Sequence, residues 1–210
     1  KLKLSACIVE EAVLYGRVDR HGIFSPCLLA GKHYPRTSDL AEGTVFNGKV
    51  LAGATGSGGE IGHICVNESE TEVCGCGKKG CLEQYVSATG IARLANIRLA
   101  KDDMPSSLRG CAISAKSVFD AVKEGDALAI EVAEEFGECL GKACAMIACV
   151  VNPDVFVIGG GVSKAGPVLL DYIVKNYTPN VFHGSRDTKF ALATLGNDAG
   201  IYGAAKLVLE

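Results

Sequence analysis

Hydrophobic positions along the chain change their spacing several times, and each spacing predicts a different kind of element. In the middle of the chain, apolar residues recur every three or four positions, which is the period of a helix that buries one face. This spacing predicts three helices, over residues 83–100, 114–123 and 126–151. Pro153 ends the third helix, and the consecutive apolar residues Val155–Ile158 then predict a short strand covered on both faces.

The flanking segments carry weaker patterns. Apolar residues surround Asn47-Gly48, a dipeptide typical of tight hairpin turns, and predict a hairpin over residues 45–51. After Ile158, the pattern predicts a helix, a strand and a closing helix, over residues 164–175, 190–194 and 201–209. Residues 1–43 show no sustained helical or strand period. Strand, glycine turn and helix in succession indicate an α/β domain.

Composition limits the kinds of partner that the protein can have. The chain has 210 residues, of which 48% are hydrophobic, and a formal net charge of −3. It can bury a core, but its charge provides no electrostatic basis for binding nucleic acid. Apolar runs stay below the roughly 20 residues of a membrane-spanning helix, and Glu10-Glu11 interrupt the apolar run that follows the basic start. We therefore expect a cytoplasmic protein with neither a nucleic-acid nor a membrane partner.

Ten cysteines are many for a cytoplasmic chain, and their distribution separates two roles. Seven are scattered, mostly among apolar residues, where a free cysteine packs as a small hydrophobic side chain. The other three, Cys74, Cys76 and Cys81, lie within eight residues, and His63 precedes them. One imidazole and three thiolates complete the tetrahedral shell of a structural zinc ion, which leaves no open position for water. The sequence therefore predicts zinc at these four residues.

Other interpretations of these residues stay open. Cys65 is the alternative fourth ligand, since a single histidine such as His63 is usually a packed or surface residue. The three clustered cysteines could also be reduced bystanders, or two of them could share a disulfide.

Two segments around this cluster form a specific pattern, Glu60-Ile61-Gly62-His63 and the run from Cys74 to Glu83. Together they resemble the signature of the ROK family (repressors, open reading frames, kinases). Other matching positions are Asn47–Lys49, Ile158–Ser163 and Asp198–Ala205. The resemblance covers about residues 44–210 and is strongest to members that phosphorylate glucose.

The resemblance implies a fold and a site. The fold is α/β, the actin-like ATPase (ribonuclease H-like) fold, with residues 44–210 forming mainly its C-terminal lobe and carrying a zinc-bound insertion. Residues 1–43 form an atypical segment that does not match the family. Glu60 and Glu83 would accept hydrogen bonds from sugar hydroxyls, and His63 would use one ring nitrogen for zinc and the other for the sugar.

The resemblance also implies a reaction, the transfer of a phosphoryl group from Mg²⁺-bound ATP to the 6-hydroxyl of glucose. The loop Gly159, Gly160 and Gly161 would lie beside adenosine, because glycines let the backbone approach a nucleotide closely. A homodimer is expected, with the helices over 126–151 and 164–175 as candidates for its interface.

Parts of a complete kinase of this family are missing from the sequence. We find no Asp-x-Gly-Gly-Thr phosphate loop and no Asn-Asp-x-Asn segment with the general-base Asp, and Arg36–Gly43 stand in place of a glycine-rich loop. Neither Asp19 nor Asp39 lies in a matching context, so no catalytic residue is assigned. We expect an incomplete chain that phosphorylates glucose weakly or not at all by itself. A disturbed reading frame over the first 40 or so residues is one hypothesis for this.

Alternative functions follow from the same pattern. ROK repressors share the zinc site, so a non-catalytic sugar sensor is possible, although residues 1–43 carry no helix-turn-helix pattern. A kinase for N-acetylmannosamine or fructose, and a plain zinc-stapled interaction module, are further alternatives.

Overall fold

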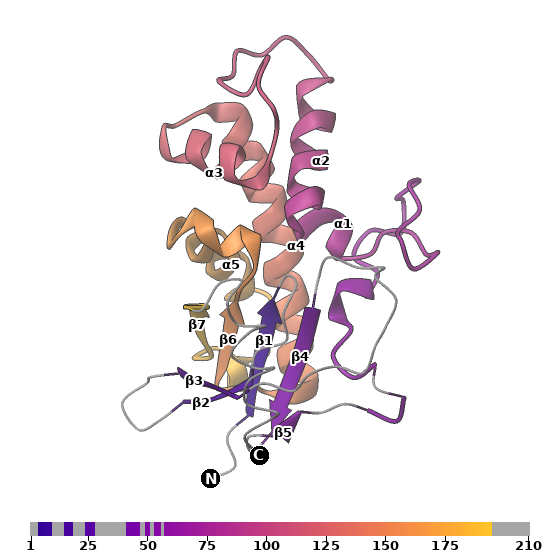
Figure 1. Cartoon of the computed structure of the whole chain (residues 1–210), viewed down its shortest axis with the longest axis vertical. Helices are drawn as coiled ribbons and strands as arrows, with labels where there is room; N and C mark the ends of the chain where they lie inside the picture. Colours follow the sequence, from indigo (N-terminus) through magenta and orange to yellow (C-terminus); the bar gives the residue numbers. More distant parts are fainter. Residues whose placement is uncertain are drawn as a thin grey trace.

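The computed structural model describes the chain in seven stretches, residues 4–9, 15–18, 24–27, 41–46, 49–50, 53–55 and 57–194 (Figure 1). The predicted closing helix over 201–209, the family's tail segment Asp198–Ala205 and the predicted turn residues Asn47-Gly48 lie outside them. No helix in the described stretches is long and apolar enough to cross a membrane.

A mixed sheet lies at one end of the molecule (Figure 1). Its order is β5-β4-β1-β6-β7, where the strands are β1 (Leu4–Val9), β4 (Ala41–Phe46), β5 (Lys49–Val50), β6 (Val155–Ile158) and β7 (Lys189–Leu192). The central strand β1 runs antiparallel to β4 and parallel to β6, and β7 runs parallel to β6. β2 (Tyr15–Val18) and β3 (Phe24–Cys27) form a separate antiparallel pair.

The strands confirm part of the sequence prediction and correct another part. β6 covers the predicted residues with all four side chains buried, and β4 and β5 form the predicted hairpin, in which Phe46 pairs with Lys49. The absence of a strand period in residues 1–43 was misleading, because β1, β2 and β3 lie there. Strand β1 gains its backbone partners from β4 and β6, both distant in sequence, so no local pattern announces it.

Five α-helices occupy the described stretches, α1 (Glu83–Val86), α2 (Ala88–Leu99), α3 (Ala115–Lys123), α4 (Ala127–Val151) and α5 (Val168–Tyr177), with 3₁₀ turns at Ile61–His63, Gly161–Ala165 and His183–Ser185. Two predicted helices differ from the observed ones. The helix over 83–100 is divided at Ser87, whose extended backbone ends α1 and whose hydroxyl caps α2. The helix after β6 begins only after Gly166, which has a φ of 84°, and Pro167.

Helix α4 runs from the helical end of the molecule toward the sheet and packs against every other α-helix (Figure 1). Glycines bring α5 directly onto it. A Cβ atom at Gly137 would lie 2.6 Å from the carbonyl oxygen of Tyr172, and one at Gly141 would lie 2.7 Å from that of Ile173. The close crossing leaves no room for a methyl group on this face of α4.

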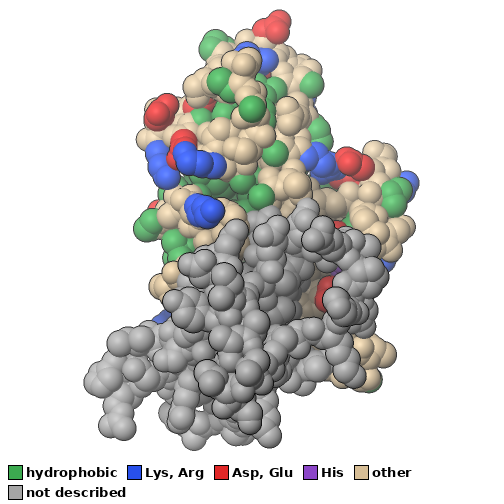
Figure 2. Space-filling model, in the orientation of Figure 1, with side chains coloured by type: hydrophobic (Ala, Val, Ile, Leu, Met, Phe, Trp, Pro, Cys, Tyr) green, Lys and Arg blue, Asp and Glu red, His purple; other side chains and the backbone are tan. Residues whose placement is uncertain are grey.

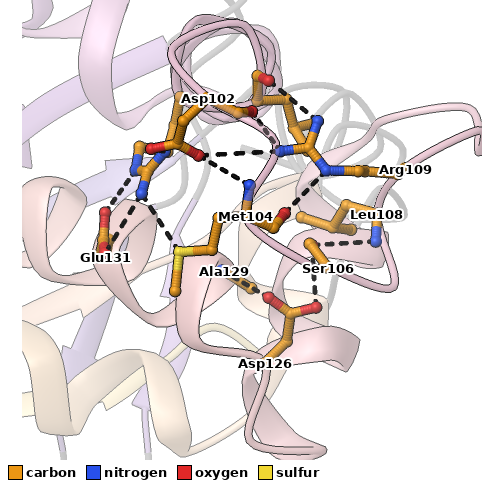
Figure 3. A network of polar contacts seen from close by, with 10 residues as sticks. Asp102, Met104, Ser106, Leu108, Arg109, Asp126, Ala129 and Glu131 are labelled. Atoms are coloured by element: carbon orange, nitrogen blue, oxygen red, sulfur yellow. Dashed lines mark hydrogen bonds and ion pairs between the residues drawn. The ribbon is translucent and has the colours of Figure 1, made fainter.

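Polar contacts fix the connection between α2 and α3 (Figure 3). The Arg109 guanidinium donates to three carbonyl groups, that of Leu99 at the end of α2 and those of Asp102 and Met104 in the connection that follows. Asp126 accepts hydrogen bonds from Ser106 and from the backbone N–H of Ala129, so it caps α4 and holds the connection at once. On the face drawn in Figure 2, acidic and basic side chains lie close together over these helices.

The close packing of α5 on Gly137 predicts that a glycine-to-alanine change in helix α4 lowers the stability of the protein. Glycine-to-alanine changes within exposed helices stabilise by about 0.5–1 kcal/mol, but Gly137→Ala should destabilise this protein by about 1–3 kcal/mol because the new methyl group meets the α5 backbone. Urea unfolding measures the difference. Glu138→Ala, at an exposed side chain of the same helix, is the matched control and should change stability by less than about 0.5 kcal/mol. A Gly137→Ala variant more stable than the natural chain would contradict the close crossing.

Candidate functional site

The four predicted metal ligands meet at one point. The ligand atoms of His63, Cys74, Cys76 and Cys81 all lie within 4.8 Å of one another. The sulfurs of Cys76 and Cys81 are 3.6 Å apart, and Nδ1 of His63 is 3.7 Å from the sulfur of Cys74. Bond lengths of about 2.0–2.3 Å at a tetrahedral zinc ion place its ligand atoms about 3.5–3.8 Å apart. The donor set and its spacing therefore fit zinc.

Short backbone contacts build this cluster from a segment that has almost no regular structure. The N–H of Cys74 donates to the carbonyl of Lys78 (2.7 Å), and the N–H of Gly77 donates back to the carbonyl of Cys74 (2.8 Å). Gly80, with a φ of 70°, packs so closely that a Cβ atom there would lie 1.9 Å from the carbonyl oxygen of Asn67. The glycines are thus required by the tight path of the backbone around the four donors.

The positions of the cysteine sulfurs distinguish between the alternative interpretations of these residues. Cys65 is exposed and pairs through its backbone with Cys81, but it does not belong to the group of converging donors. The 3.6 Å between the sulfurs of Cys76 and Cys81 is far longer than the roughly 2.05 Å of a disulfide bond. Cys65, Cys74, Cys76 and Cys81 form no disulfide with one another. Four converging donors favour a metal over a disulfide.

Burial and neighbouring groups set the protonation of the thiols. Burial raises the pKa of Cys74 well above its usual range, and a hydrogen bond to Glu83 raises it further. Burial likewise raises the pKa of Cys81. Burial acts in the same direction on Cys76, but the backbone N–H of Lys78 and the neighbouring thiols lower its pKa overall. Buried thiols keep their protons until a cation replaces them, so metal binding to this cluster must release protons.

The predicted sugar ligands lie at different distances from the cluster. Glu83 is the first residue of α1, and its Oε1 lies 2.7 Å from the sulfur of Cys74 and 3.5 Å from Nδ1 of His63. Glu60 precedes the 3₁₀ turn that carries His63, and its side chain is exposed. A groove of about 420 Å³ borders the cluster, lined by Cys74, Glu83, Arg93 and their neighbours.

The predicted nucleotide loop lies at the carboxyl end of β6. Gly159 and Gly160 are buried, and Gly160 has a φ of 75°, which favours glycine. The hydroxyl of Ser163 donates to the carbonyl of Gly160 (2.7 Å) and closes the turn. Ligands of open α/β sheets bind at the carboxyl ends of parallel strands, so the placement is suitable. The contact of Gly159, Gly160 and Gly161 with a nucleotide stays a prediction.

A network that the sequence analysis did not single out joins the cysteine segment to α2. Arg93 forms ion pairs with Glu70 and Glu72, and the hydroxyl of Tyr85 donates to Glu70 (2.7 Å). A backbone N–H of Glu72, then Tyr85 and Arg93, lower the pKa of Glu70 from its ordinary 4.5 to about 2, against the opposing effect of burial. Because Glu70 and Arg93 are 23 residues apart, no sequence pattern could have linked them.

The sheet, its helices and the cysteine segment define an actin-like ATPase fold of the sugar-kinase type. A ROK family glucokinase from Streptomyces griseus, solved in complex with glucose and AMPPNP, has a TM-score of 0.75 to this chain at 27% identity, and the match covers 98% of this chain and 60% of that one. The chain belongs to the ROK family, whose model matches residues 40–210. The predicted family is thus confirmed.

Several relatives have the names of sugar kinases. A glucokinase from Halalkalibacterium halodurans is 43% identical over an alignment of 177 positions, which covers 80% of this chain and 52% of that protein. The N-acetylgalactosamine kinase AgaK from Shewanella sp. is 30% identical over an alignment of 216 positions, which covers 96% of this chain and 67% of that protein. A ROK family transcriptional regulator, a homolog of the E. coli MLC protein, has a TM-score of 0.72 at 26% identity, with 97% of this chain and 45% of that one covered. The chain spans about half the length of the glucokinases.

The cluster predicts one zinc ion per chain. Cys76→Ser removes a thiolate and should lower zinc occupancy at least about tenfold at limiting metal, whereas the matched control Cys65→Ser should keep the ion. Elemental analysis of the purified chains measures both. Removing the metal with a chelator should lower the melting temperature, because metal-binding free energy contributes to folding. Zinc lost from Cys65→Ser but retained by Cys76→Ser would contradict the assigned ligands.

The lowered pKa of Glu70 predicts that the folded protein loses stability in acid. Its pKa is lowered on folding, so its contribution is complete above about pH 4.5 and disappears as the pH falls toward 2. In zinc-free protein, Glu70→Gln should cost about 1–2 kcal/mol of unfolding free energy at pH 7 and much less near pH 2.5. Denaturant unfolding at both pH values measures this. Exposed Glu68→Gln is the control, and a cost for Glu70→Gln that does not shrink in acid would contradict the network.

Proposed function

We propose that this chain is the sugar-binding and zinc-binding part of an ATP-dependent hexose kinase that converts glucose to glucose 6-phosphate. The observation that carries the proposal is the convergence of Glu83 and His63 on the cysteine cluster, with Oε1 of Glu83 3.5 Å from Nδ1 of His63. Relatives named glucokinase, and the related S. griseus structure with glucose and AMPPNP, support glucose and ATP as its substrates.

The site has the chemistry that a sugar requires. Carboxylates accept strong hydrogen bonds from hydroxyl groups, and Glu83 begins helix α1 with its side chain only 15% exposed. Nδ1 of His63 faces Cys74, so the other ring nitrogen, Nε2, is left to bind a sugar hydroxyl. Glu60 is exposed three residues before His63 and would supply a second carboxylate.

Zinc would have a structural role in this scheme. His63, Cys74, Cys76 and Cys81 would hold it, and the ion would cross-link the segment without contacting the reacting phosphate. Its effect on the sugar is therefore indirect, because it holds His63 in place and stabilises the backbone that leads into Glu83.

The phosphoryl-transfer half of the reaction needs groups beyond this site. Mg²⁺ would arrive with ATP, and Gly159, Gly160 and Gly161 would approach the nucleotide. No general base is assigned in the sequence, so we expect weak or no turnover from this chain alone. Binding of the sugar is therefore the direct test of the proposal.

Two alternatives have specific support. The relative AgaK and relatives named N-acetyl-D-glucosamine kinase favour an N-acetylated hexosamine as a competing substrate. The structural likeness to a ROK transcriptional regulator favours a sugar sensor. Comparing the sugars in one binding experiment decides the first, and DNA binding by the chain would support the second.

A homodimer in the cytoplasm is part of the proposal. Exposed apolar side chains on α4 and α5, Met146, Val150 and Val174, support a partner on these helices. The clustered cysteines Cys74, Cys76 and Cys81 form no disulfide, which supports a reducing compartment.

The predicted sugar contacts can be measured by calorimetry. Glu83→Gln keeps the shape of the side chain but removes its charge, and it should weaken glucose binding roughly tenfold or more while zinc stays bound. Glu60→Gln should weaken it by a smaller factor, and exposed Glu68→Gln should leave it unchanged. N-acetylglucosamine and fructose are titrated alongside. Unchanged glucose binding in Glu83→Gln would contradict the proposed site.

A further inference from the structure

Arg93 joins helix α2 to the cysteine segment and to α1 through polar contacts. It lies on the second turn of α2, and its side chain is only 19% exposed. Its guanidinium donates in three directions, to Glu70, to Glu72 (2.6 Å) and to the backbone carbonyl of Gln84 (3.2 Å). It also lies over the ring of Tyr85, 5.6 Å from the ring centre. The planar five-donor group of arginine suits such a junction, and a lysine ammonium does not reproduce it.

The contacts of Arg93 reach the chain on both sides of Glu83, the residue proposed to bind the sugar. Glu72 lies two residues before Cys74, and Gln84 directly follows Glu83. Arg93 therefore ties together the segment that leads into the cluster and the helix that begins with Glu83. Arg93 and Glu83 also line the same groove.

Gln84 extends this junction to a metal ligand. Its side-chain oxygen accepts from the N–H of Cys81 (3.0 Å), and its side-chain nitrogen donates to the carbonyl of Glu72 (3.1 Å). One buried amide thus links Cys81 to the segment that Arg93 holds. The backbone around Glu83 is fixed from the side of the cluster and from the side of α2.

Helix α1 needs such external support. It has four residues, and no side chain caps its first turn, since the residue before it is Leu82. A single helical turn is unstable by itself, because nucleation of a helix is costly. The direction of the Glu83 side chain therefore depends on whatever holds the α1 backbone.

We propose that Arg93 is a positioning residue that holds α1 in register, so that the Glu83 carboxylate points at the sugar. The inference rests on the proposed sugar site. The hydrogen bonds of Arg93 go to the carbonyl of Gln84 and to the carboxylates of Glu70 and Glu72, and it acts through these groups.

The same helix offers a matched control. Arg98 also forms two ion pairs, with Asp102 and Glu131, but these contacts hold the connection to α3 and helix α4 rather than the cysteine segment (Figure 3). Arg93→Met and Arg98→Met each remove one arginine with two acidic partners. Only the first should alter the site.

The test combines zinc analysis with glucose calorimetry on the natural chain, Arg93→Met, Arg93→Lys and Arg98→Met. We expect Arg93→Met to keep one zinc ion and to bind glucose about tenfold more weakly, because a small misplacement of a binding group is costly. Arg93→Lys should not restore binding, and Arg98→Met should bind like the natural chain. Equal weakening in both methionine variants would overturn the proposal in favour of general destabilisation, and so would unchanged binding in Arg93→Met.

A double variant separates positioning from an independent contact. If Arg93 acts through Glu83, then adding Arg93→Met to Glu83→Gln should weaken glucose binding little further, whereas additive effects would overturn the proposal. The rate of amide hydrogen exchange at residues 84–86 measures how stably α1 is held, and it can be measured without any sugar. This rate should increase in Arg93→Met but not in Arg98→Met. If the natural chain binds none of the sugars, the proposed function is contradicted, and the exchange experiment then tests the role of Arg93 by itself. Unchanged exchange rates at residues 84–86 in Arg93→Met would overturn the positioning role with or without sugar binding.

Discussion

Three sulfur atoms and one imidazole nitrogen lie within 4.8 Å of one another, and the conformation of the surrounding segment depends on how these four atoms are accommodated. Thiolates packed this closely repel one another, and burial keeps protons on Cys74 and Cys81 unless a cation takes their place. A cation that satisfies all four donors would cross-link residues 63–81, whose backbone forms only short turns and isolated bridges. Glu83 sits at the edge of this cluster, so the proposed sugar site inherits its geometry from the metal ligands.

A site built on turns still needs a rigid support. Helix α4 provides it, because Gly137 and Gly141 let α5 pack directly on its backbone while its other faces contact α1, α2 and α3. Helix α2 transmits that rigidity to the cysteine segment through Arg93. The proposed metal ligands would hold the loop from within, and the helices hold it from outside, so a binding group on this loop would be closely fixed.

The helices and strands differ in how well their local patterns predicted them. Helices α3 and α4 and strand β6 lie where the sequence pattern placed them, because their capping residues and apolar faces are adjacent in the chain. The helix expected over 83–100 is interrupted at Ser87, a good capping residue that the apolar period alone did not reveal as a boundary. Strands β1 to β3 were missed because their stability comes from pairing with other strands, which local period does not report.

The sequence by itself determined which donors the site contains and how they are spaced, since His63, Cys74, Cys76 and Cys81 lie close together along one glycine-rich segment. It also carried the family signature that implied a sugar kinase. Only the tertiary structure decided that Cys65 stands outside the cluster and that Glu83 touches Cys74. The junction of Arg93 with Glu70 likewise joins residues that no local period or spacing relates, because such contacts depend on how distant segments pack against each other.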